Sequence, residues 1–301
     1  MPELGGFFLV TAAGLCWIGL GISVSMCAAR GWNFNIVQGL NYLGSVMLCA
    51  LLLAGSGPRG SFNMLFGWGF LLSCLAGIAN FFAYVLVARA MRKGPNGLVW
   101  GIMQAGMIGS FLMGVIFFGE PAAPLRLAGL GLILSGVLMM GMSRDGGVSW
   151  QGRQWMLPSL GAFLLVMVTH CCSALPSYLA GVSPAGGIVR TMGLYSGGAI
   201  GFALVTLPEM IRRRNWGGRG EWISAGILML LNTSASVFFF YRGLDLLAKR
   251  GCGGLGYPLA IGVCITGFSL YSLLILKEKI ARPGLIGLGA VCIGIIIIAI
   301  R

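Results

Sequence analysis

Three polar side chains gather within one apolar stretch of the chain. Gln38, Asn41 and Tyr42 stand at positions i, i+3 and i+4, and on a helix this spacing places them on one face. Amide and phenol groups donate and accept hydrogen bonds, so together they could replace the hydration shell of a polar solute. Hydrogen bonds between helices, worth about 1 kcal/mol each in a membrane, are the structural alternative. Both interpretations require these residues to face other helices.

Similar polar positions recur in other apolar stretches. Asn80 and Tyr84 are four residues apart, as are Asn232 and Ser236, and Gln104 stands among apolar neighbours. Polar groups at bilayer depth are costly, so each needs a partner or a cargo on the inside of a helix bundle. The predicted substrate-binding residues are Gln38, Asn41, Tyr42, Asn80, Tyr84, Gln104, Arg190 and Asn232, with Trp17 as a ring on which a sugar could stack.

Two ionisable side chains also fall within apolar stretches. His170 is the only histidine of the chain, and imidazole titrates near neutral pH, so it is the predicted site of proton coupling. A neutral hydrogen-bonding histidine is the alternative. Arg190 lies a few residues into the stretch 186–208. Its long stem could reach the interface, or its guanidinium could bind a carboxylate or phosphate of a substrate or pair within the protein.

The acidic residues argue against one kind of transport. No Asp or Glu lies near the centre of an apolar stretch, whereas a carrier that exchanges protons for a cationic drug needs a carboxylate there. A neutral or anionic polar metabolite is therefore favoured as the cargo. Arg242, Asp245 and Lys249 are expected to form ion pairs at i, i+3 and i, i+4 along one helix face.

Motifs for catalysis and for metal binding are absent from the sequence. The run Gly251–Gly256 resembles a phosphate-binding loop only superficially, because no strand precedes it and no Lys-Ser/Thr follows. The nine cysteines lie mostly in apolar stretches, where they are expected to pack as small residues rather than form disulfides or hold a metal. We predict no enzyme activity, no cofactor and no metal.

The composition indicates the elements that must position these residues. Of 301 residues 57% are hydrophobic and 9% charged, with a mean hydropathy of +0.92, whereas a soluble domain has about 25% charged residues. The chain is therefore expected to be an all-α integral membrane protein in a lipid bilayer, with no nucleic-acid partner. The ten predicted spans are 5–28, 35–54, 64–88, 96–118, 124–142, 155–179, 186–208, 222–247, 253–276 and 283–300.

The second half of the chain repeats the first. A shift of 158 residues (278 − 120) superposes Glu120 on Glu278 and also places Gly129 on Gly287, Gly131 on Gly289 and Gly136 on Gly294. Five spans per half is an odd number, so the halves, 1–145 and 146–301, should cross the bilayer in opposite directions. Glu120 and Glu278 are expected at helix ends on opposite sides, capping a turn or pairing with Arg126, Lys277 or Lys279.

The loop charges predict an orientation. Most lysines and arginines outside the spans, including Arg212, Arg213 and Arg214, lie on the side opposite the two termini. Because cationic loops are retained in the cytoplasm, this distribution favours termini on the outer side.

Several short motifs follow one another along the chain: Ala88–Pro95, Phe117–Glu120, Gly129–Gly136, Arg190, Leu276–Glu278 and Gly287–Gly294. Together they resemble the ten-span, EamA-like members of the drug/metabolite transporter superfamily. That resemblance implies alternating access, with spans 1–4 and 6–9 around a central cavity, spans 5 and 10 bracing them, and both termini in the cytoplasm of a bacterial inner-membrane protein. Gly77–Asn80 and Trp32-Asn33 are also similar to the rhamnose–proton symporter branch, from which no substrate is carried over.

Two functions follow as hypotheses. The first is a secondary transporter that moves a small polar metabolite, such as a sugar or an amino acid, with protons as a candidate second partner. The alternative is a flippase for a lipid-linked polar head group, which a polar cavity open to lipid would favour. Whether the chain forms a homodimer is left open.

Overall fold

The chain folds into a bundle of long helices. The computed structural model describes residues 3–55, 64–93, 96–143, 154–179, 186–275, 277 and 282–299, and all regular structure in these ranges is helical, which confirms the all-α prediction. Among the described residues, eight helical segments are long and apolar enough to cross a membrane, and two shorter apolar helices accompany them. Helices suit apolar segments because each satisfies its own backbone hydrogen bonds without water.

The helices coincide with the ten predicted spans within a few residues. Neighbouring spans alternate in direction, so the start of α1 and the end of α12 lie at the same end of the bundle. In chain order the helices are α1 (Glu3–Arg30), α2 (Phe34–Gly55), α3 (Met64–Met91), α4 (Asn96–Gln104) with α5 (Ile108–Phe118), α6 (Pro124–Ser143), α7 (Met156–Tyr178), α8 (Gly186–Arg213), α9 (Arg219–Ser234) with α10 (Tyr241–Ala248), α11 (Gly256–Leu274) and α12 (Arg282–Ala299).

Two spans expected to be continuous are interrupted. A 3₁₀ turn, Ala105–Met107, separates α4 from α5, and a π-helical turn, Ala235–Phe240, separates α9 from α10. Such irregular turns change the hydrogen-bond register of the backbone, and they are frequent at functional sites. A further correction concerns α8, which continues to Arg213. An ion pair of Arg213 with Glu209 one turn earlier, 2.8 Å long, supports its last turn.

The outer surface of the bundle is apolar, unlike the surface of a water-soluble protein. Large apolar side chains such as Leu51, Leu204 and Ile227 are more than half exposed along the outside, whereas Asn41 and Thr191 are almost fully buried. An apolar exterior is stable in contact with lipid tails, so the arrangement is that of a membrane protein that keeps its polar groups in the interior.

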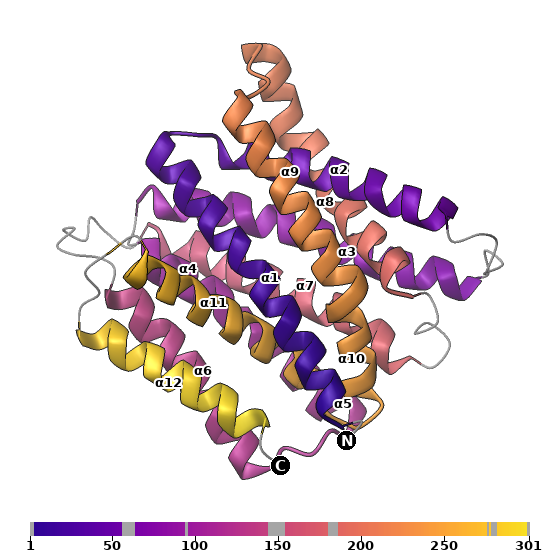
Figure 1. Cartoon of the computed structure of the whole chain (residues 1–301), viewed down its shortest axis with the longest axis vertical. Coiled ribbons are helices and arrows are strands. Elements are labelled where there is room, and N and C mark those ends of the chain that lie inside the picture. The colour runs from indigo at the N-terminus through magenta and orange to yellow at the C-terminus, as the bar shows by residue number, and fades with distance from the viewer. Residues whose placement is uncertain are drawn as a thin grey trace.

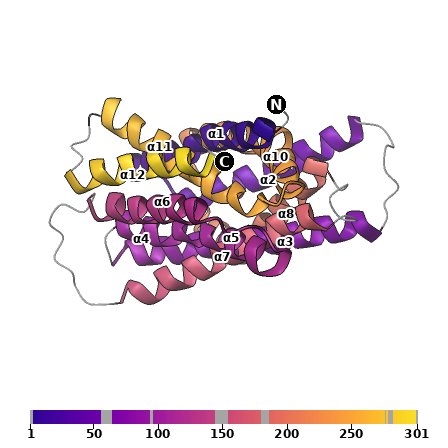
Figure 2. The ribbon, with the colours of Figure 1, turned by 90° about the horizontal axis from the view of Figure 1, so that it is seen from below.

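The helices α6 and α12 lie side by side along one edge of the bundle (Figures 1 and 2). A Cβ atom on Gly136 would lie 2.5 Å from the carbonyl oxygen of Gly287, and one on Gly287 would lie 2.6 Å from that of Gly136. Gly129 and Gly294 face each other in the same reciprocal way. Glycine therefore allows the two backbones to touch.

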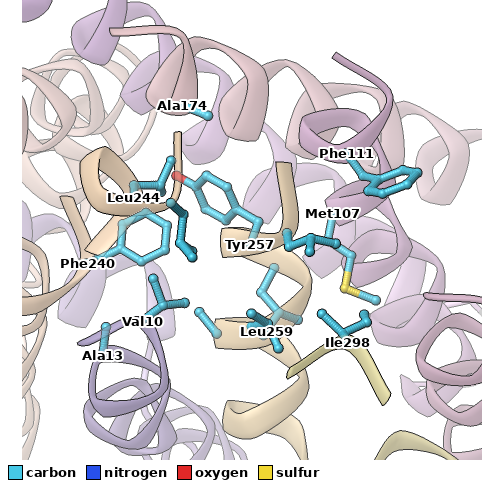
Figure 3. Close-up of a cluster of buried hydrophobic side chains, with 14 of the residues drawn as sticks. Val10, Ala13, Met107, Phe111, Ala174, Phe240, Leu244, Tyr257, Leu259 and Ile298 are labelled. Carbon is cyan, nitrogen blue, oxygen red and sulfur yellow. The ribbon is translucent and has the colours of Figure 1, made fainter. Parts of the chain in front are cut away.

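Many of the other helix contacts connect the two halves of the chain. Helix α3 packs on α7 and α8, while α2 packs on α8 and α9. Helix α1 packs on α10 and α11, and α7 packs on α4 and α5. Apolar residues from α1, α5, α6, α7, α10, α11 and α12 form the largest buried cluster, in which Tyr257 occupies a central place (Figure 3).

Candidate functional site

The polar residues predicted on one face of α2 point into the bundle. The Nδ2 atom of Asn41 donates a hydrogen bond to Oε1 of Gln38 (3.1 Å), and both side chains are buried. The Oδ1 atom of Asn41 has no hydrogen-bond partner, and the hydroxyl of Tyr42 lies beside the side chain of Asn80. The ring of Tyr42 contacts Phe81 and Tyr195, at centroid distances of 6.5 and 6.0 Å. The three residues thus face the inside of the bundle, and the Asn41 oxygen remains available as an acceptor.

The neighbouring helix α9 presents matching polar groups. Thr233 donates a hydrogen bond to the hydroxyl of Ser45 on α2 (2.9 Å), and this buried contact holds α2 and α9 together. Asn232 is also buried, and its Oδ1 atom has no partner. Thr233 therefore holds the two helices together, while Asn232 leaves its Oδ1 atom available to a solute.

Aromatic residues adjoin these polar groups. Tyr84 lies between Phe34 and Trp100, at centroid distances of 5.9 and 6.3 Å. Trp17 contacts Phe240 of the π-helical turn at 4.8 Å. Among the predicted residues Trp17, Asn80, Tyr84 and Gln104 are partly exposed, whereas Gln38, Asn41, Tyr42, Arg190 and Asn232 are buried.

His170 is buried in α7 and stacks on Tyr257 of α11, with 4.0 Å between the ring centroids. It also forms a hydrogen bond with the backbone of Gly106, in the 3₁₀ turn between α4 and α5. Its Nδ1 atom has no partner. His170 therefore joins three spans and retains one nitrogen that could exchange a proton.

Arg190 is fully buried and does not extend to the membrane interface. Its guanidinium donates hydrogen bonds to Oδ1 of Asp245 (2.8 Å), the Ser173 carbonyl (2.8 Å) and the Ser177 hydroxyl (2.9 Å). Ser177 in turn donates to Oδ1 of Asp245 (2.6 Å). The guanidinium carbon lies 4.2 Å from the centroid of the Tyr241 ring. Asp245 thus forms its ion pair with Arg190 of α8, and not with Arg242 or Lys249 as expected from the sequence.

The glutamate at the end of α5 has a structural role, as predicted, but different partners. Glu120 accepts hydrogen bonds from the backbone N–H groups of Gly253 (2.6 Å) and Gly254 (3.0 Å) and from the Tyr178 hydroxyl (2.9 Å). It thus caps the start of the span that contains α11. Burial raises the pKa of Glu120, and these hydrogen bonds partly offset the shift. Glu278 lies outside the described residues.

Sequence reasoning missed the residues that surround Arg190. Asp245 was assigned to a local ion pair, and Ser173, Ser177 and Tyr241 were not singled out at all. The i, i+4 spacings of Ser173 with Ser177 and of Tyr241 with Asp245 were the available signals, because each pair shares one helix face. Nothing in the sequence indicated that both faces meet Arg190.

The outside of the bundle carries an apolar groove between α3, α7 and α8. Leu75, Phe82, Val168 and Val205 line it, and Arg89 in the last turn of α3 is a charged lining residue. All nine cysteines are free thiols. Within the described ranges no group of three or more His, Cys, Asp or Glu residues could hold a metal ion.

Comparisons with known proteins give partial likenesses. No protein-family model matches the chain. Guanidinium exporters of Escherichia coli (strain K12) and Citrobacter freundii are 36% and 34% identical to it over 59 residues, which are 19% of this chain and 56% of each exporter. The chain thus spans about half the length of these curated relatives. A solved structure described as "Crystal structure of protein" covers 97% of this chain and 95% of its own, with a TM-score of 0.72 and 16% identity. That likeness shows a shared fold.

Proposed function

We propose that this protein is a secondary transporter that moves a small polar solute across the membrane by alternating access. Buried polar atoms without partners carry the proposal: Oδ1 of Asn41 and Oδ1 of Asn232. Leaving such atoms unpaired in a low-dielectric interior costs about 1–3 kcal/mol each. A polar cargo that hydrogen-bonds to them would offset this cost.

Two inverted halves, 1–145 and 146–301, would supply the two states that alternating access requires. The shift of 158 residues relates Gly129 to Gly287 and Gly136 to Gly294. A two-fold axis would turn the contact of Gly136 with Gly287 into the contact of Gly294 with Gly129, and both contacts are present. Exchanging the halves likewise turns the packing of α3 on α8 into that of α9 on α2. These correspondences support the proposed symmetry.

The family that we propose is the EamA-like branch of the drug/metabolite transporter superfamily. The duplicated motifs favour it, and the ten helical spans and the reciprocal packing of α6 and α12 agree with its expected bracing helices. The short match to bacterial guanidinium exporters supports a transporter of small solutes rather than an enzyme, and it supports location in a bacterial inner membrane.

The cargo is proposed to be a sugar, an amino acid or a related polar metabolite. Asp245 already pairs with Arg190, and Glu120 and Glu221 accept hydrogen bonds from backbone N–H groups. The described interior therefore offers a solute amides, hydroxyls and aromatic rings. A planar guanidinium cation is the second candidate, because the relatives named above are guanidinium exporters. Aromatic faces such as those of Trp17 and Tyr84 would attract it.

The flippase hypothesis predicts a polar cavity that opens to lipid. The groove between α3, α7 and α8 is lined almost wholly by apolar side chains, so it does not meet that condition. The carrier is therefore the favoured function.

Transport by purified protein in liposomes tests the proposal. A thermal-shift screen against sugars, amino acids and guanidinium would first select ligands, and uptake of each labelled ligand would follow. We expect saturable uptake of at least one solute and trans-stimulation by the same solute on the other side. Scrambling of labelled lipid without uptake of any solute would favour the flippase and overturn the carrier.

Proton coupling through His170 is a separate test. If the unpartnered nitrogen of His170 takes up the coupled proton, His170→Gln should abolish uptake driven by a pH gradient while leaving solute exchange intact. Glutamine retains hydrogen-bonding groups but does not titrate. An unchanged response of uptake to the pH gradient would contradict this role.

A further inference from the structure

The groups around Arg190 match a guanidinium ion on several sides. The Asp245 carboxylate supplies the negative charge, and the Ser173 carbonyl and Ser177 hydroxyl accept further N–H groups. The Tyr241 ring covers one face of the planar cation at 4.2 Å. Carboxylate, in-plane acceptors and an aromatic face are the features that recognise guanidinium and not simply a positive charge.

The side chain that fills this site belongs to the chain itself. Arg190 is on α8, whereas its partners are on α7 and α10, so the three helices are joined through one guanidinium group. The Arg190 side chain has no exposed surface, while the Asp245 side chain is 22% exposed. The site is therefore reachable from outside on the side of the carboxylate.

The site lies at the end of the bundle where α7 and α10 finish and α8 begins. The same end holds a second set of contacts, in which Glu120 joins the end of α5 to the turn before α11 and to Tyr178. Both sets would have to separate or move together before this end of the bundle could open.

We propose that Ser173, Ser177, Tyr241 and Asp245 form a guanidinium-binding site in which Arg190 is a tethered ligand, and that release of Arg190 opens this end of the bundle. The first part concerns binding alone. The second rests on the proposed function, because only a transporter needs the opening. A guanidinium-bearing cation that reaches Asp245 competes with Arg190 and favours the open state.

The binding site is tested by removing the Arg190 side chain and supplying free guanidinium in its place. Arg190→Ala removes the tethered cation and leaves Asp245 unpaired, so the melting temperature should fall. Millimolar guanidinium, far below denaturing concentrations, should bind in the vacated space and raise the melting temperature of Arg190→Ala. Wild-type protein should show no comparable rise. Equal responses of variant and wild type would overturn the proposed site.

Chemical and mutational controls sharpen this test. Urea has a similar planar shape without charge, and methylammonium has the charge without the planar set of donors, so neither should stabilise Arg190→Ala. The double variant Arg190→Ala/Asp245→Asn should not respond to guanidinium. Arg89→Ala removes an exposed arginine from α3 and serves as the matched control, with no guanidinium effect expected.

Hydrogen–deuterium exchange tests the opening and covers the case in which Arg190→Ala does not fold. Arg190→Lys keeps the charge but cannot reproduce the three hydrogen bonds. Exchange should then rise in segments 173–178 and 241–248, while the contact of α6 with α12 stays protected. Unchanged exchange in those segments would refute the opening role. If guanidinium raises the melting temperature of Arg190→Ala but hydrogen exchange in Arg190→Lys equals that of the wild type, the binding site stands and the link to transport fails.

Discussion

Asn41 is buried in α2 with a side-chain oxygen that has no partner, and this atom is the most direct test of solute binding. Asn41→Ala should raise the half-saturation concentration for transport about tenfold, the equivalent of about 1.4 kcal/mol for one lost hydrogen bond. Uptake by reconstituted variants would measure it. Ser135→Ala is the matched control, because that exposed hydroxyl bonds only its own helix.

The interpretation also requires that the Asn41 variant remains folded. The hydrogen bond of Asn41 to Gln38 lies within α2, so its loss should change the melting temperature little. Equal half-saturation constants for wild type and Asn41→Ala would remove Asn41 from the binding site, whatever the cargo.

Glu120 provides a prediction about pH. Burial raises its pKa in the folded state above the ordinary carboxyl value, so the folded state binds the proton more tightly than the unfolded state does. The stability from this linkage is present at low pH and is lost as pH rises through the folded-state pKa. Glu120→Gln should flatten this part of the dependence of melting temperature on pH. The same slope in variant and wild type would show that other groups cause it.

Some residues of the candidate site could be predicted from the sequence, and others could not. Gln38, Asn41 and Tyr42 are polar within an apolar run, and a helix of known period makes them neighbours. Asp245 is different, because its partner Arg190 is 55 residues away. Only the packing of α10 against α7 and α8 brings them together, and apolar periodicity does not indicate which helices pack against each other.

At the scale of elements, the spans were predictable because bilayer thickness fixes the length of an apolar helix. The 3₁₀ turn at Ala105–Met107 and the π-helical turn at Ala235–Phe240 could not be predicted from the sequence. Neither segment contains proline or a charged residue that would mark a break. Both turns contact neighbouring helices: Gly106 lies against the backbone of α7 at Phe163, and Phe240 contacts Trp17 of α1.

The contact between α6 and α12 predicts a contrast between glycines of one helix. In Gly136→Leu the new side chain would meet the backbone of Gly287, so we expect a loss of about 1–3 kcal/mol or more from overpacking. In Gly131→Leu a Cβ atom meets nothing within 4 Å, and leucine faces lipid at little cost. Thermal unfolding in detergent compares the two. Similar melting temperatures for both variants would contradict the close approach of the helices.

The symmetry proposal extends this contrast to the second half of the chain. Gly287→Leu should be as harmful as Gly136→Leu, and Gly289→Leu as mild as Gly131→Leu, because Gly289 also faces open space. Matching pairs of effects are expected if the halves are equivalent by a two-fold axis. Unequal effects within a pair would indicate that α6 and α12 pack without this equivalence.

At the scale of the whole molecule, the charges divide unevenly between the two ends of the bundle. Arg30, Arg92 and Arg213 all lie at the end opposite the start of α1. That end also carries Arg89, Lys93, Arg212, Arg214, Arg219 and Arg282, whereas Arg126, Arg242, Lys249 and Arg250 belong to the other. Cationic residues near span ends resist translocation, so the richer end should be cytoplasmic.

This distribution predicts that both termini lie outside, in contrast to the orientation that the family resemblance implies. Alkaline phosphatase fused to the C-terminus should therefore be active, and a fluorescent protein fused there should be dark. The same reporters inserted after Arg214, at the opposite end of the bundle, should give the reverse result and serve as the internal control. A fluorescent C-terminal fusion would show that the charges do not determine the orientation. The proposed inverted symmetry would explain how either outcome is compatible with one fold, because a bundle built from two opposed halves would present nearly the same helices from both sides.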